Sequence, residues 1–544
     1  MNMRNQNMKA PATYLLNARK WIRNHKSASL ITGILIAANL SITIPLAAIL
    51  NIWTDEAYSL NTSGGDISYA IHQSIFFEEQ APLYFLLLNL WRQLNESFFF
   101  ARLFSILCIS LTIYTVSVLS KKFLSFPISS WVTAAVAFNP FIIWAAVEIR
   151  LYAFSILLST LLLLLFLETY LNNHSSKYRL QCLFILVSTL SLYTHYFLAF
   201  SLAAGAITLA LLGKKRVLLN YLLDLTIVGI LFFPLAFQLA HQLSSVTAQK
   251  ELIDPNASQN VLLNHLKGLK TVLAISVSYL LPISRSLETN TIAKFFLAIS
   301  QILRFIFLVA LVFLFIKYRR LIRSFNCGLI GSFNRSLYLI TLVLFTIFIV
   351  IYSLLEGVHS RHLDSLFIPV ILSVFCILVA VQHAIKKPVF YYWLAASFSF
   401  YFVALCVTYS PLAKQGDYLR VASYITANEK PSQAILAFNP EVGMVFKHYY
   451  KGPNPVAVIP KEIDYQHFTW KNFVLDSEQE ITTALSQTLH ERSDIWLLIN
   501  LKEIQEQRLY NHSLQILKHF IEQHYSITST KEFYGSTVQL LKYK

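Results

Sequence analysis

Long apolar runs alternate with short polar turns over the first three quarters of the chain. A helix needs about 20 apolar residues to cross the hydrocarbon layer of a bilayer, which is roughly 30 Å thick. Eleven runs approach or exceed this length, so the pattern predicts a polytopic α-helical membrane protein with about 11 transmembrane helices. The predicted spans cover residues 29–52, 98–119, 128–147, 151–171, 181–195, 197–213, 217–240, 291–316, 337–355, 365–385 and 389–410.

Lysine and arginine gather in every second turn between these spans. Residues 1–28 hold six of them and no acid, whereas residues 53–97 hold six acids and one arginine. Because Lys and Arg are retained on the cytoplasmic side, we expect 1–28 to be a cytoplasmic tail and 53–97 an outer loop of a transmembrane domain over 29–410. The other basic turns contain Lys121 and Lys122, Lys177 and Arg179, Lys214 to Arg216, Lys317 to Arg335, and Lys386 and Lys387.

Residues 241–290 are ambiguous, because the apolar stretch 271–283 is short and follows Lys267 and Lys270. If this stretch spanned the membrane, the basic cluster after residue 316 would lie outside. We therefore expect 241–290 to be an outer loop with helices along the membrane surface. An odd number of spans then places the C-terminal tail outside.

The tail, residues 411–544, has the composition of a soluble domain. Helical and strand patterns alternate along it, which predicts an extracytoplasmic α/β domain with a small sheet. It contains no Gly-rich nucleotide motif at a strand-to-helix turn. The domain either recognises an acceptor or caps the membrane part. We expect helices at 417–429, 441–450, 477–490 and 502–524, strands at 434–438, 456–460 and 495–500, and a strand pair near 525–543.

The overall composition supports the membrane assignment. The chain has 544 residues, of which 56% are hydrophobic and 13% charged, and this excludes an ordinary soluble protein. Its net charge of +16 needs no nucleic-acid partner, because the cations lie at the ends of the predicted helices. All five cysteines lie in predicted spans or in the inner loop after residue 316, so we expect no disulfide in the outer parts.

Five polar clusters lie at the predicted outer ends of the spans. Polar groups at the membrane boundary are costly, and they therefore indicate a functional site. The clusters bring acids, arginines, histidines and tyrosines to one side of the membrane. They are Asp55 and Glu56; Glu78 to Tyr84, which includes Glu79; Glu148, Arg150 and Tyr152; Tyr193 to Tyr196, which includes His195; and His359, Arg361 and His362.

Four of these clusters also have a purely structural interpretation. Asp55 and Glu56 then mark a helix leaving the membrane, and Glu148 and Arg150 form an ion pair in a turn. His195 belongs to an interfacial aromatic belt, and the last cluster contacts lipid head groups. No Cys/His spacing resembles a zinc site, so a metal site would need carboxylates from different loops.

Taken together and in this order, the segments resemble a known family. The chain is similar to the membrane glycosyltransferases of the dolichyl-phosphate-mannose protein mannosyltransferase and aminoarabinose transferase type, which have the GT-C fold. One departure is Gln80-Ala81-Pro82, where the family often has His-Pro-Pro, so no role of that histidine is carried over. The matching segments are Asp55-Glu56, PLYFLLLNLW at 82–91, RLFSILCISLTIYTV at 102–116, EIRLYAFSILLS at 148–159, YTHYF at 193–197, RHLDSLFIP at 361–369, DYLRVASYI at 417–425 and HYYKGPNPV at 448–456.

The resemblance implies transfer of a hexosyl or pentosyl group from a polyprenyl-phosphate donor to a lipid, glycan or protein acceptor at the outer face. It implies that Asp55 is the catalytic base, because an acceptor hydroxyl is a poor nucleophile until its proton is removed. A single displacement then inverts the anomeric centre. Glu56 is the second catalytic candidate, Arg150 and Arg361 are the expected cations for the phosphate, and a divalent metal on Asp55, Glu56 and Glu148 is a possible substitute for them. The further substrate-binding candidates are Glu79, Tyr84, Glu148, Tyr152, His195 and His362.

Two other functions fit a chain with many spans. A transporter or flippase for lipid-linked sugars should show internal repeats or broken helices, and the sequence shows neither. A polysaccharide polymerase or ligase shares the outward site but does not have a carboxylate pair in the first loop as its main signature. For a transferase of this type, we expect the bacterial inner membrane as the location, with the C-terminal domain outside.

Overall fold

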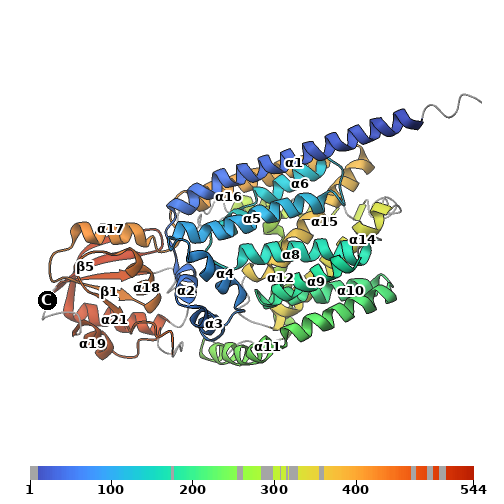
Figure 1. The fold of residues 1–544 in the computed structure, drawn as a ribbon. Coiled ribbons are helices and arrows are strands. Elements are labelled where there is room, and N and C mark those ends of the chain that lie inside the picture. Colours follow the sequence, from blue (N-terminus) through green and yellow to red (C-terminus); the bar gives the residue numbers. More distant parts are fainter. Residues whose placement is uncertain are drawn as a thin grey trace, which may run out of the picture. The chain divides into compact units, whose positions relative to one another are not determined.

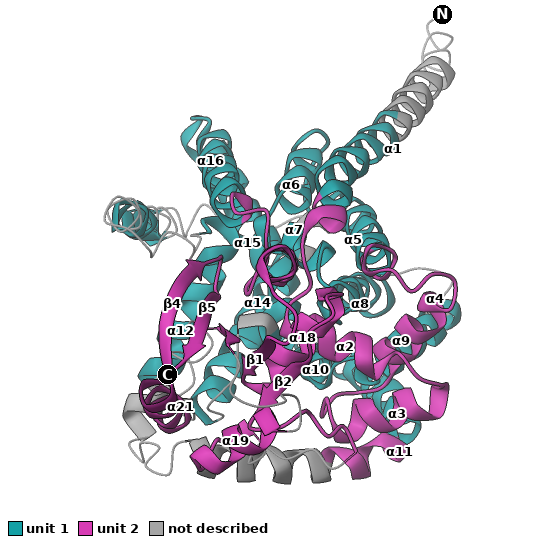
Figure 2. Cartoon of the chain, turned by 90° about the vertical axis from the view of Figure 1, so that its left-hand side faces the viewer, with its two compact units in different colours: residues 1–45, 103–232, 260–408 teal, residues 46–102, 233–259, 409–544 magenta. Residues whose placement is uncertain are grey.

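The structure is a computed structural model of the chain. The chain forms two compact units, which Figure 2 colours separately. The helical unit comprises residues 1–45, 103–232 and 260–408, and the sheet unit comprises 46–102, 233–259 and 409–544. The structure describes residues 10–544 apart from 173–176, 254–260, 283–297, 307, 311, 314–315, 318–328, 355–359, 467–472, 487–493 and 501–509.

Seven helices among the described residues are long and apolar enough to cross a membrane, or eight spans if one bent pair is included. The polytopic helical prediction is confirmed, but the described residues do not confirm the predicted number of 11 spans. The helices α9 (Lys177–Leu192) and α10 (Ala199–Leu211) are shorter, and the predicted span 291–316 is described only in parts. The seven belong to α1 (Ala10–Ile49), α5 (Phe98–Ser120), α8 (Tyr152–Phe166) with η1 (Leu167–Leu171), α11 (Lys215–Ile253), α14 (Leu329–Leu354), α15 (Asp364–Ile385) and α16 (Val389–Tyr409) (Figure 1).

The predicted span 128–147 is broken into α6 (Ile128–Ala137) and α7 (Pro140–Ala146), which meet at 52°. Pro140 has no N–H to continue the helix. The side chain of Asn139 caps α7 by accepting a hydrogen bond from the Phe141 N–H at 2.9 Å, and its Nδ2 donates to the Tyr279 carbonyl at 2.6 Å. The expectation that the chain has no broken helix is therefore wrong at this point.

Helix α12 (Val261–Leu280) occupies the stretch expected to lie along the membrane surface. Val272 and Tyr279 are buried, and α12 packs against α14 and α15. At Gly268 a Cβ atom would lie 2.7 Å from Ser353 Oγ and 2.9 Å from the Ile349 carbonyl, so the absence of a side chain permits the close approach of α14. The C-terminal half of α12 is thus part of the core of the helical unit, which differs from the predicted surface helix.

The C-terminal part of the chain forms a five-stranded sheet in the order β2-β1-β3-β5-β4. The first three strands are parallel and the last two add in antiparallel fashion. This sheet confirms the α/β prediction. The prediction was possible because the pattern of buried strands and amphipathic helices is visible in the local sequence. The elements are α17 (Tyr418–Asn428), β1 (Ala434–Phe438), α18 (Pro440–Tyr449), β2 (Val456–Ile459), α19 (Glu478–Ser486), β3 (Ile495–Ile499), α21 (Tyr510–His524), β4 (Tyr525–Glu532) and β5 (Thr537–Tyr543).

Helices cover both faces of this sheet. Leu436 and Leu497 lie in a buried cluster with side chains of α19 and α21. On the other face the Tyr424 ring of α17 contacts Trp496, and Gly443 of α18 lies against Val458. Because successive residues of a strand face opposite sides, the fully apolar strand β3 can be buried on both faces.

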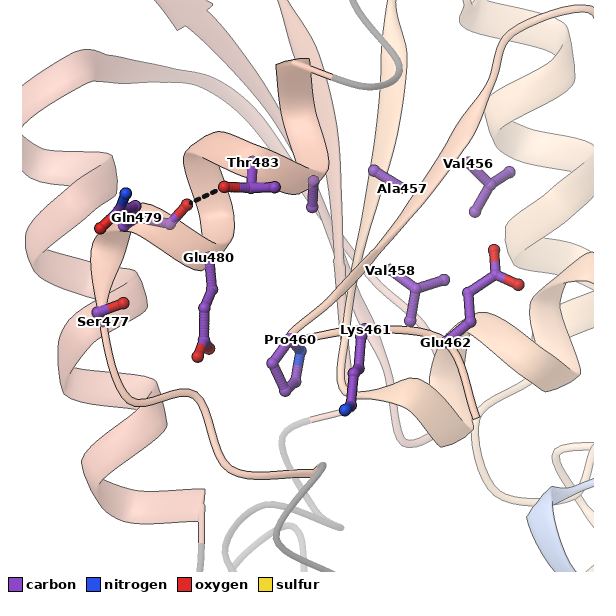
Figure 3. Close-up of a pocket in the computed structure, with 11 residues that line it drawn as sticks. Val456, Ala457, Val458, Pro460, Lys461, Glu462, Ser477, Gln479, Glu480 and Thr483 are labelled. Atoms are coloured by element: carbon purple, nitrogen blue, oxygen red, sulfur yellow. Dashed lines mark hydrogen bonds between the residues drawn. The ribbon is translucent and has the colours of Figure 1, made fainter. Parts of the chain in front are cut away.

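A groove of about 460 Å³ lies between the edge strand β2 and helix α19 (Figure 3). Among the described strands, β2 pairs with β1 alone, so the groove follows its unpaired side. The groove combines aliphatic side chains from β2 with hydroxyl, amide and charged side chains. Its lining includes Val456, Val458, Pro460, Lys461, Glu462, Ser477, Gln479, Glu480 and Thr483.

The segment 53–97, predicted to be an outer loop, belongs to the same compact unit as the C-terminal part of the chain. Its helices are α2 (Thr54–Thr62), α3 (Ile67–Phe76) and α4 (Leu83–Arg92). The hydroxyl of Tyr58 on α2 donates to Glu441 Oε1 on α18 at 2.7 Å. At the other end of α2, Arg92 Nη1 donates to the Leu60 carbonyl at 2.6 Å and to Ser63 Oγ at 2.8 Å. An arginine at this end satisfies free carbonyls and complements the helix dipole.

Candidate active site

The two adjacent acids of the first loop point in different directions. Asp55 and Glu56 both lie in the first turn of α2, where negative charge is favourable. Neighbouring residues on an α-helix are separated by about 100° around the axis. Glu56 is therefore on the buried face, with an exposed fraction of 0%, whereas Asp55 is half-buried. The sequence alone does not reveal this division.

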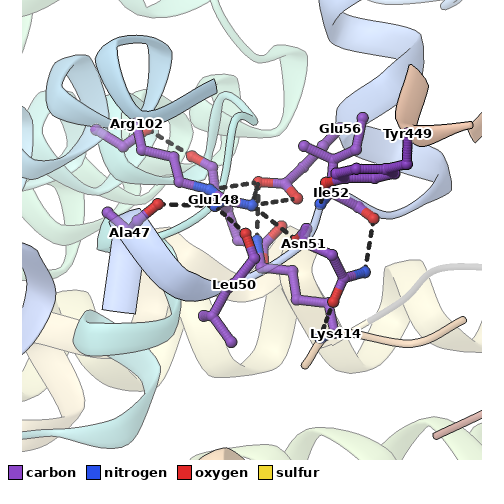
Figure 4. A network of polar contacts seen from close by, with 10 residues as sticks. Ala47, Leu50, Asn51, Ile52, Glu56, Arg102, Glu148, Lys414 and Tyr449 are labelled. Carbon is purple, nitrogen blue, oxygen red and sulfur yellow. Dashed lines mark hydrogen bonds and ion pairs between the residues drawn. The ribbon is translucent and has the colours of Figure 1, made fainter. Parts of the chain in front are cut away.

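The Glu56 carboxylate is held by two cations (Figure 4). Arg102 Nη2 lies 3.0 Å from Oε2, Arg102 Nε lies 3.2 Å from Oε1, and Lys414 Nζ lies 2.8 Å from Oε1. The Arg102 side chain is 1% exposed and the Lys414 side chain 10%. Bidentate pairing with a guanidinium fixes both the position and the charge of a carboxylate.

Arg102 also caps the C-terminal end of α1. Arg102 Nη1 donates to the carbonyls of Ala47 at 2.9 Å and Leu50 at 2.6 Å, and Nη2 donates to the Asn51 carbonyl at 2.9 Å. The last carbonyls of a helix have no partner within the helix, so these bonds satisfy groups that would otherwise be buried without one. Arg102 thus ties the end of α1 to the start of α2.

The C-terminal part reaches the same segment. The backbone N–H of Lys414 donates to Asn51 Oδ1 at 2.7 Å, and the backbone N–H of Ile52 donates to the Tyr449 hydroxyl at 2.5 Å. Residues more than 350 positions apart in the chain therefore fix the connection that leads into α2.

The ion pairs also set the protonation state of Glu56. Burial by itself would raise the pKa of this carboxyl, but the charges and hydrogen bonds of Arg102 and Lys414 outweigh it and hold the pKa below its usual value. Glu56 is consequently ionised near neutral pH and engaged by donors on both oxygens. This arrangement suits a group that positions α2 better than one that accepts a proton.

Glu148 and Arg150 lie in the short connection between α7 and α8. Their exposed fractions are 2% and 4%, so this connection is not a solvated turn. Ser105 Oγ donates to the backbone carbonyl of Glu148 at 2.6 Å, and the Tyr152 ring stacks on Trp144 with centroids 5.0 Å apart. A role of these residues in donor binding stays a prediction.

The rings of His195, Phe197 and His362 form a three-membered cluster in the helical unit. Phe197 stacks on His362 with centroids 4.9 Å apart and on His195 at 5.3 Å, and the two imidazole centroids are 5.9 Å apart. His195 Nδ1 lies 3.7 Å from Asp364 Oδ2 and 3.4 Å from Ser155 Oγ. The structure thus groups these two predicted residues. The backbone of Arg361 belongs to η4 (Ser360–Leu363), but its side chain lies outside the described residues.

Glu79 and Tyr84 lie around the turn between α3 and α4. The backbone of Glu79 has a φ of 52°, in the left-handed region that costs energy for a residue with a side chain. Tyr84 in the first turn of α4 is 1% exposed and makes an edge-to-face contact with Phe85. The described part of the chain contains no group of three or more His, Cys, Asp or Glu side chains arranged to hold a metal ion.

Sequence reasoning did not identify three charged residues that the structure brings into these clusters. Arg102 and Asp364 each had a signal, because each is a charge in or at the start of an apolar run. Lys414 had no such signal in the sequence, because it lies in a polar tail where lysine is common. Its role depends on tertiary contact alone.

Comparison with known proteins gives matches at the level of structure. No family model matches the chain, and no curated protein matches its sequence. The crystal structure of ArnT from Cupriavidus metallidurans in the apo state has a TM-score of 0.51 and 10% identity, and the match covers 94% of this chain and 98% of that one. The same protein bound to undecaprenyl phosphate has a TM-score of 0.51 and 9% identity, with 93% and 97% covered.

An oligosaccharyltransferase from Archaeoglobus fulgidus, in complex with zinc and sulfate, has a TM-score of 0.49 and 11% identity, and covers 94% of this chain and 72% of that one. At such low identities the likeness to ArnT establishes the fold and not the activity. It extends over nearly the full length of both chains, through the helices and the C-terminal sheet. The chain therefore has the GT-C fold, as the ordered motifs of its sequence predicted.

Proposed function

We propose that this chain is a glycosyltransferase that moves a sugar from a polyprenyl-phosphate donor to an acceptor at the outer face of the membrane. The observation that carries the proposal is the full-length likeness to ArnT, whose structure has been described with undecaprenyl phosphate bound. The half-buried Asp55 in the first turn of α2, next to the fixed Glu56, supports it.

Asp55 is the general base of this mechanism. Its carboxylate takes the proton of the acceptor hydroxyl as the hydroxyl oxygen forms a bond to the anomeric carbon. The bond between that carbon and the phosphate oxygen breaks, and its electron pair leaves with the polyprenyl phosphate. Attack opposite the leaving group inverts the anomeric centre. The departing phosphate is already a weak base, so it needs no proton from an acid.

Cationic and N–H groups stabilise the charge that the phosphate gains. Arg150 and Arg361 are the residues we propose for this role, with Glu148, Tyr152, Glu79 and Tyr84 binding the sugar or the acceptor. Glu56 keeps α2, and therefore Asp55, in a fixed position through Arg102 and Lys414. The mechanism involves this chain's side chains alone, and a divalent cation would add charge stabilisation.

The test is a transfer assay with the purified full-length protein. The protein is incubated with candidate polyprenyl-phosphate sugars and acceptors, and release of polyprenyl phosphate is followed. We expect release that depends on the acceptor and is lost in Asp55→Asn. If the protein instead moves an intact lipid-linked sugar across vesicles without release, the proposal is wrong and the chain is a flippase.

A further inference from the structure

The groove beside β2 contains none of the described residues that we assign to the transfer reaction. It belongs entirely to the sheet unit, with β2 on one side and α19 on the other (Figure 3). Its volume of about 460 Å³ is within the range of ligand-binding clefts, which is roughly 300 to 1,000 Å³. The groove is therefore large enough for a binding role of its own.

The backbone of β2 presents hydrogen-bonding groups on its outer edge. Ile435 of β1 is in register with Val456, and its N–H donates to the Pro455 carbonyl at 2.9 Å. In a parallel pair, a residue bonds to the two residues that flank its partner, so the Val456 and Val458 backbone groups face away from β1. No hydrogen bond joins these groups to a described residue outside the sheet. They lie two residues apart, about 6.6 Å, which is the repeat of an extended chain.

The ends and walls of the groove limit what can enter it. Pro455 precedes β2 and Pro460 follows it, so the open edge is four residues long. Neighbouring strands of a sheet lie about 4.8 Å apart. A single extended chain fits beside β2, whereas the edge of a second sheet would bring its next strand against α19. The shape thus favours one peptide segment over a second copy of this sheet.

The charges of the lining also favour a peptide over a lipid phosphate. Lys461 and Glu480 both line the groove (Figure 3), and Glu462 is paired with Lys447. Because acids and a lysine share the lining, a phosphate group would meet repulsion as well as attraction. The hydroxyl and amide side chains on the α19 side can bond the polar side chains of a polypeptide.

We propose that this groove docks an extended peptide segment of a partner protein, which adds to β2 as a sixth strand of the sheet. The peptide backbone bonds the N–H and C=O groups of Val456 and Val458, and its side chains contact the aliphatic and polar lining. In this mode of recognition the main chain supplies affinity and the flanking side chains supply specificity. The inference goes beyond the proposed function, which concerns the first loop.

The test uses the purified full-length protein and a positional-scanning library of seven-residue peptides that are capped at both ends. Val456→Pro removes one N–H that faces the groove and leaves the bonds between β1 and β2 intact, and proline is tolerated at such a position of an edge strand. Val456→Thr is the matched control, because it keeps both the N–H and the branched side chain. We expect peptides that bind the native protein and Val456→Thr equally, and Val456→Pro about tenfold more weakly, because a peptide carbonyl loses its donor.

A second measurement uses the native protein and the best peptide of the library with alternate backbone amides N-methylated. Only every second amide of an added strand faces β2, so methylation of one alternating set should abolish binding and methylation of the other set should be tolerated. The inference is overturned if no peptide binds the native protein, if Val456→Pro binds like Val456→Thr, or if both methylated sets bind equally. The methylated peptides decide the question if Val456→Pro does not fold. No lipid donor is present, so the outcome is separate from that of the transfer assay.

Discussion

Among the described residues, the sheet unit and the helical unit each contain one acid with no exposed surface, and the surroundings of the two acids differ. Glu56 in the sheet unit is engaged by Arg102 and Lys414 on both oxygens. Asp364 in the helical unit has an imidazole at 3.7 Å and one oxygen that accepts no hydrogen bond from any described residue. Both side chains have an exposed fraction of 0%, so burial alone does not separate their roles.

The difference shows how a buried charge that serves the fold can be recognised from its partners. A buried ion pair whose oxygens and N–H groups all have partners has nothing left to offer a substrate, and breaking it chiefly destabilises the fold. A buried carboxylate whose nearest cationic partner is a histidine, as at Asp364, has its charge offset only when that histidine is protonated. We therefore assign Glu56 to the architecture of the first loop, while Asp364 pairs with His195 inside the helical unit.

The largest effect is expected at the residue next to Glu56. Asp55→Asn keeps the size of the side chain but cannot accept a proton, so turnover should fall by about 10²- to 10⁴-fold. Thermal stability and donor binding should stay near those of the native protein. Glu56→Gln should show the reverse pattern, with lower stability and a smaller loss of turnover per folded molecule. Near-normal turnover in Asp55→Asn would refute the assignment of the base and direct attention to Glu148.

Removing Arg102, the arginine partner of Glu56, should have the second-largest effect, which is a loss of folding stability. Arg102→Met leaves a buried carboxylate with one cation and leaves three carbonyls near the end of α1 without their donor. Breaking a buried pair in this way costs about 3 to 5 kcal/mol of folding free energy. The unfolding midpoint of the purified protein measures the loss, and Lys447→Met, which removes an exposed ion pair with Glu462, is the control. Equal midpoints for the two variants would show that the network around Glu56 is not structural.

A smaller effect is expected in the helical unit at Arg150. Arg150→Gln removes a buried cation that we assign to the phosphate, so the Michaelis constant for the donor should rise about tenfold. The protein level and the stability in detergent should remain close to normal if Arg150 serves the ligand. A variant with unchanged donor kinetics but a lower unfolding midpoint would place Arg150 with Glu56 among the structural charges.

The smallest effect is a dependence of stability on pH. The pKa of Glu56 is lower in the folded chain than in the unfolded chain, so the folded protein binds fewer protons at acid pH. The stabilisation by its ion pairs is complete above the unfolded value of about 4.3 and is lost as the pH falls through the lower folded value. Unfolding midpoints measured from pH 7 downward should thus drop more steeply below about pH 4 in the native protein than in Glu56→Gln. Parallel curves would contradict this contribution.

Local patterns were enough to predict much of this molecule. Apolar runs long enough to span a bilayer predicted most of the long helices, and alternating patterns predicted the strands and helices after residue 411. These signals are local because a helix or a strand buries its own repeating face. The order of the motifs also predicted the GT-C fold, and a pair of acids after the first long run marked Asp55 and Glu56 as candidates.

The tertiary structure alone decided which neighbours each charge has. Asp55 and Glu56 are neighbours in the sequence, but the helical turn of α2 directs Glu56 into the core and leaves Asp55 half-buried. Lys414 meets Glu56 across more than 350 residues, and Asp364 meets His195 across more than 160. No periodicity links residues so far apart, because their contact arises from the packing of whole elements. The electrostatic energy of a charge depends on these distant neighbours and on its burial, and both exist only once the chain has folded.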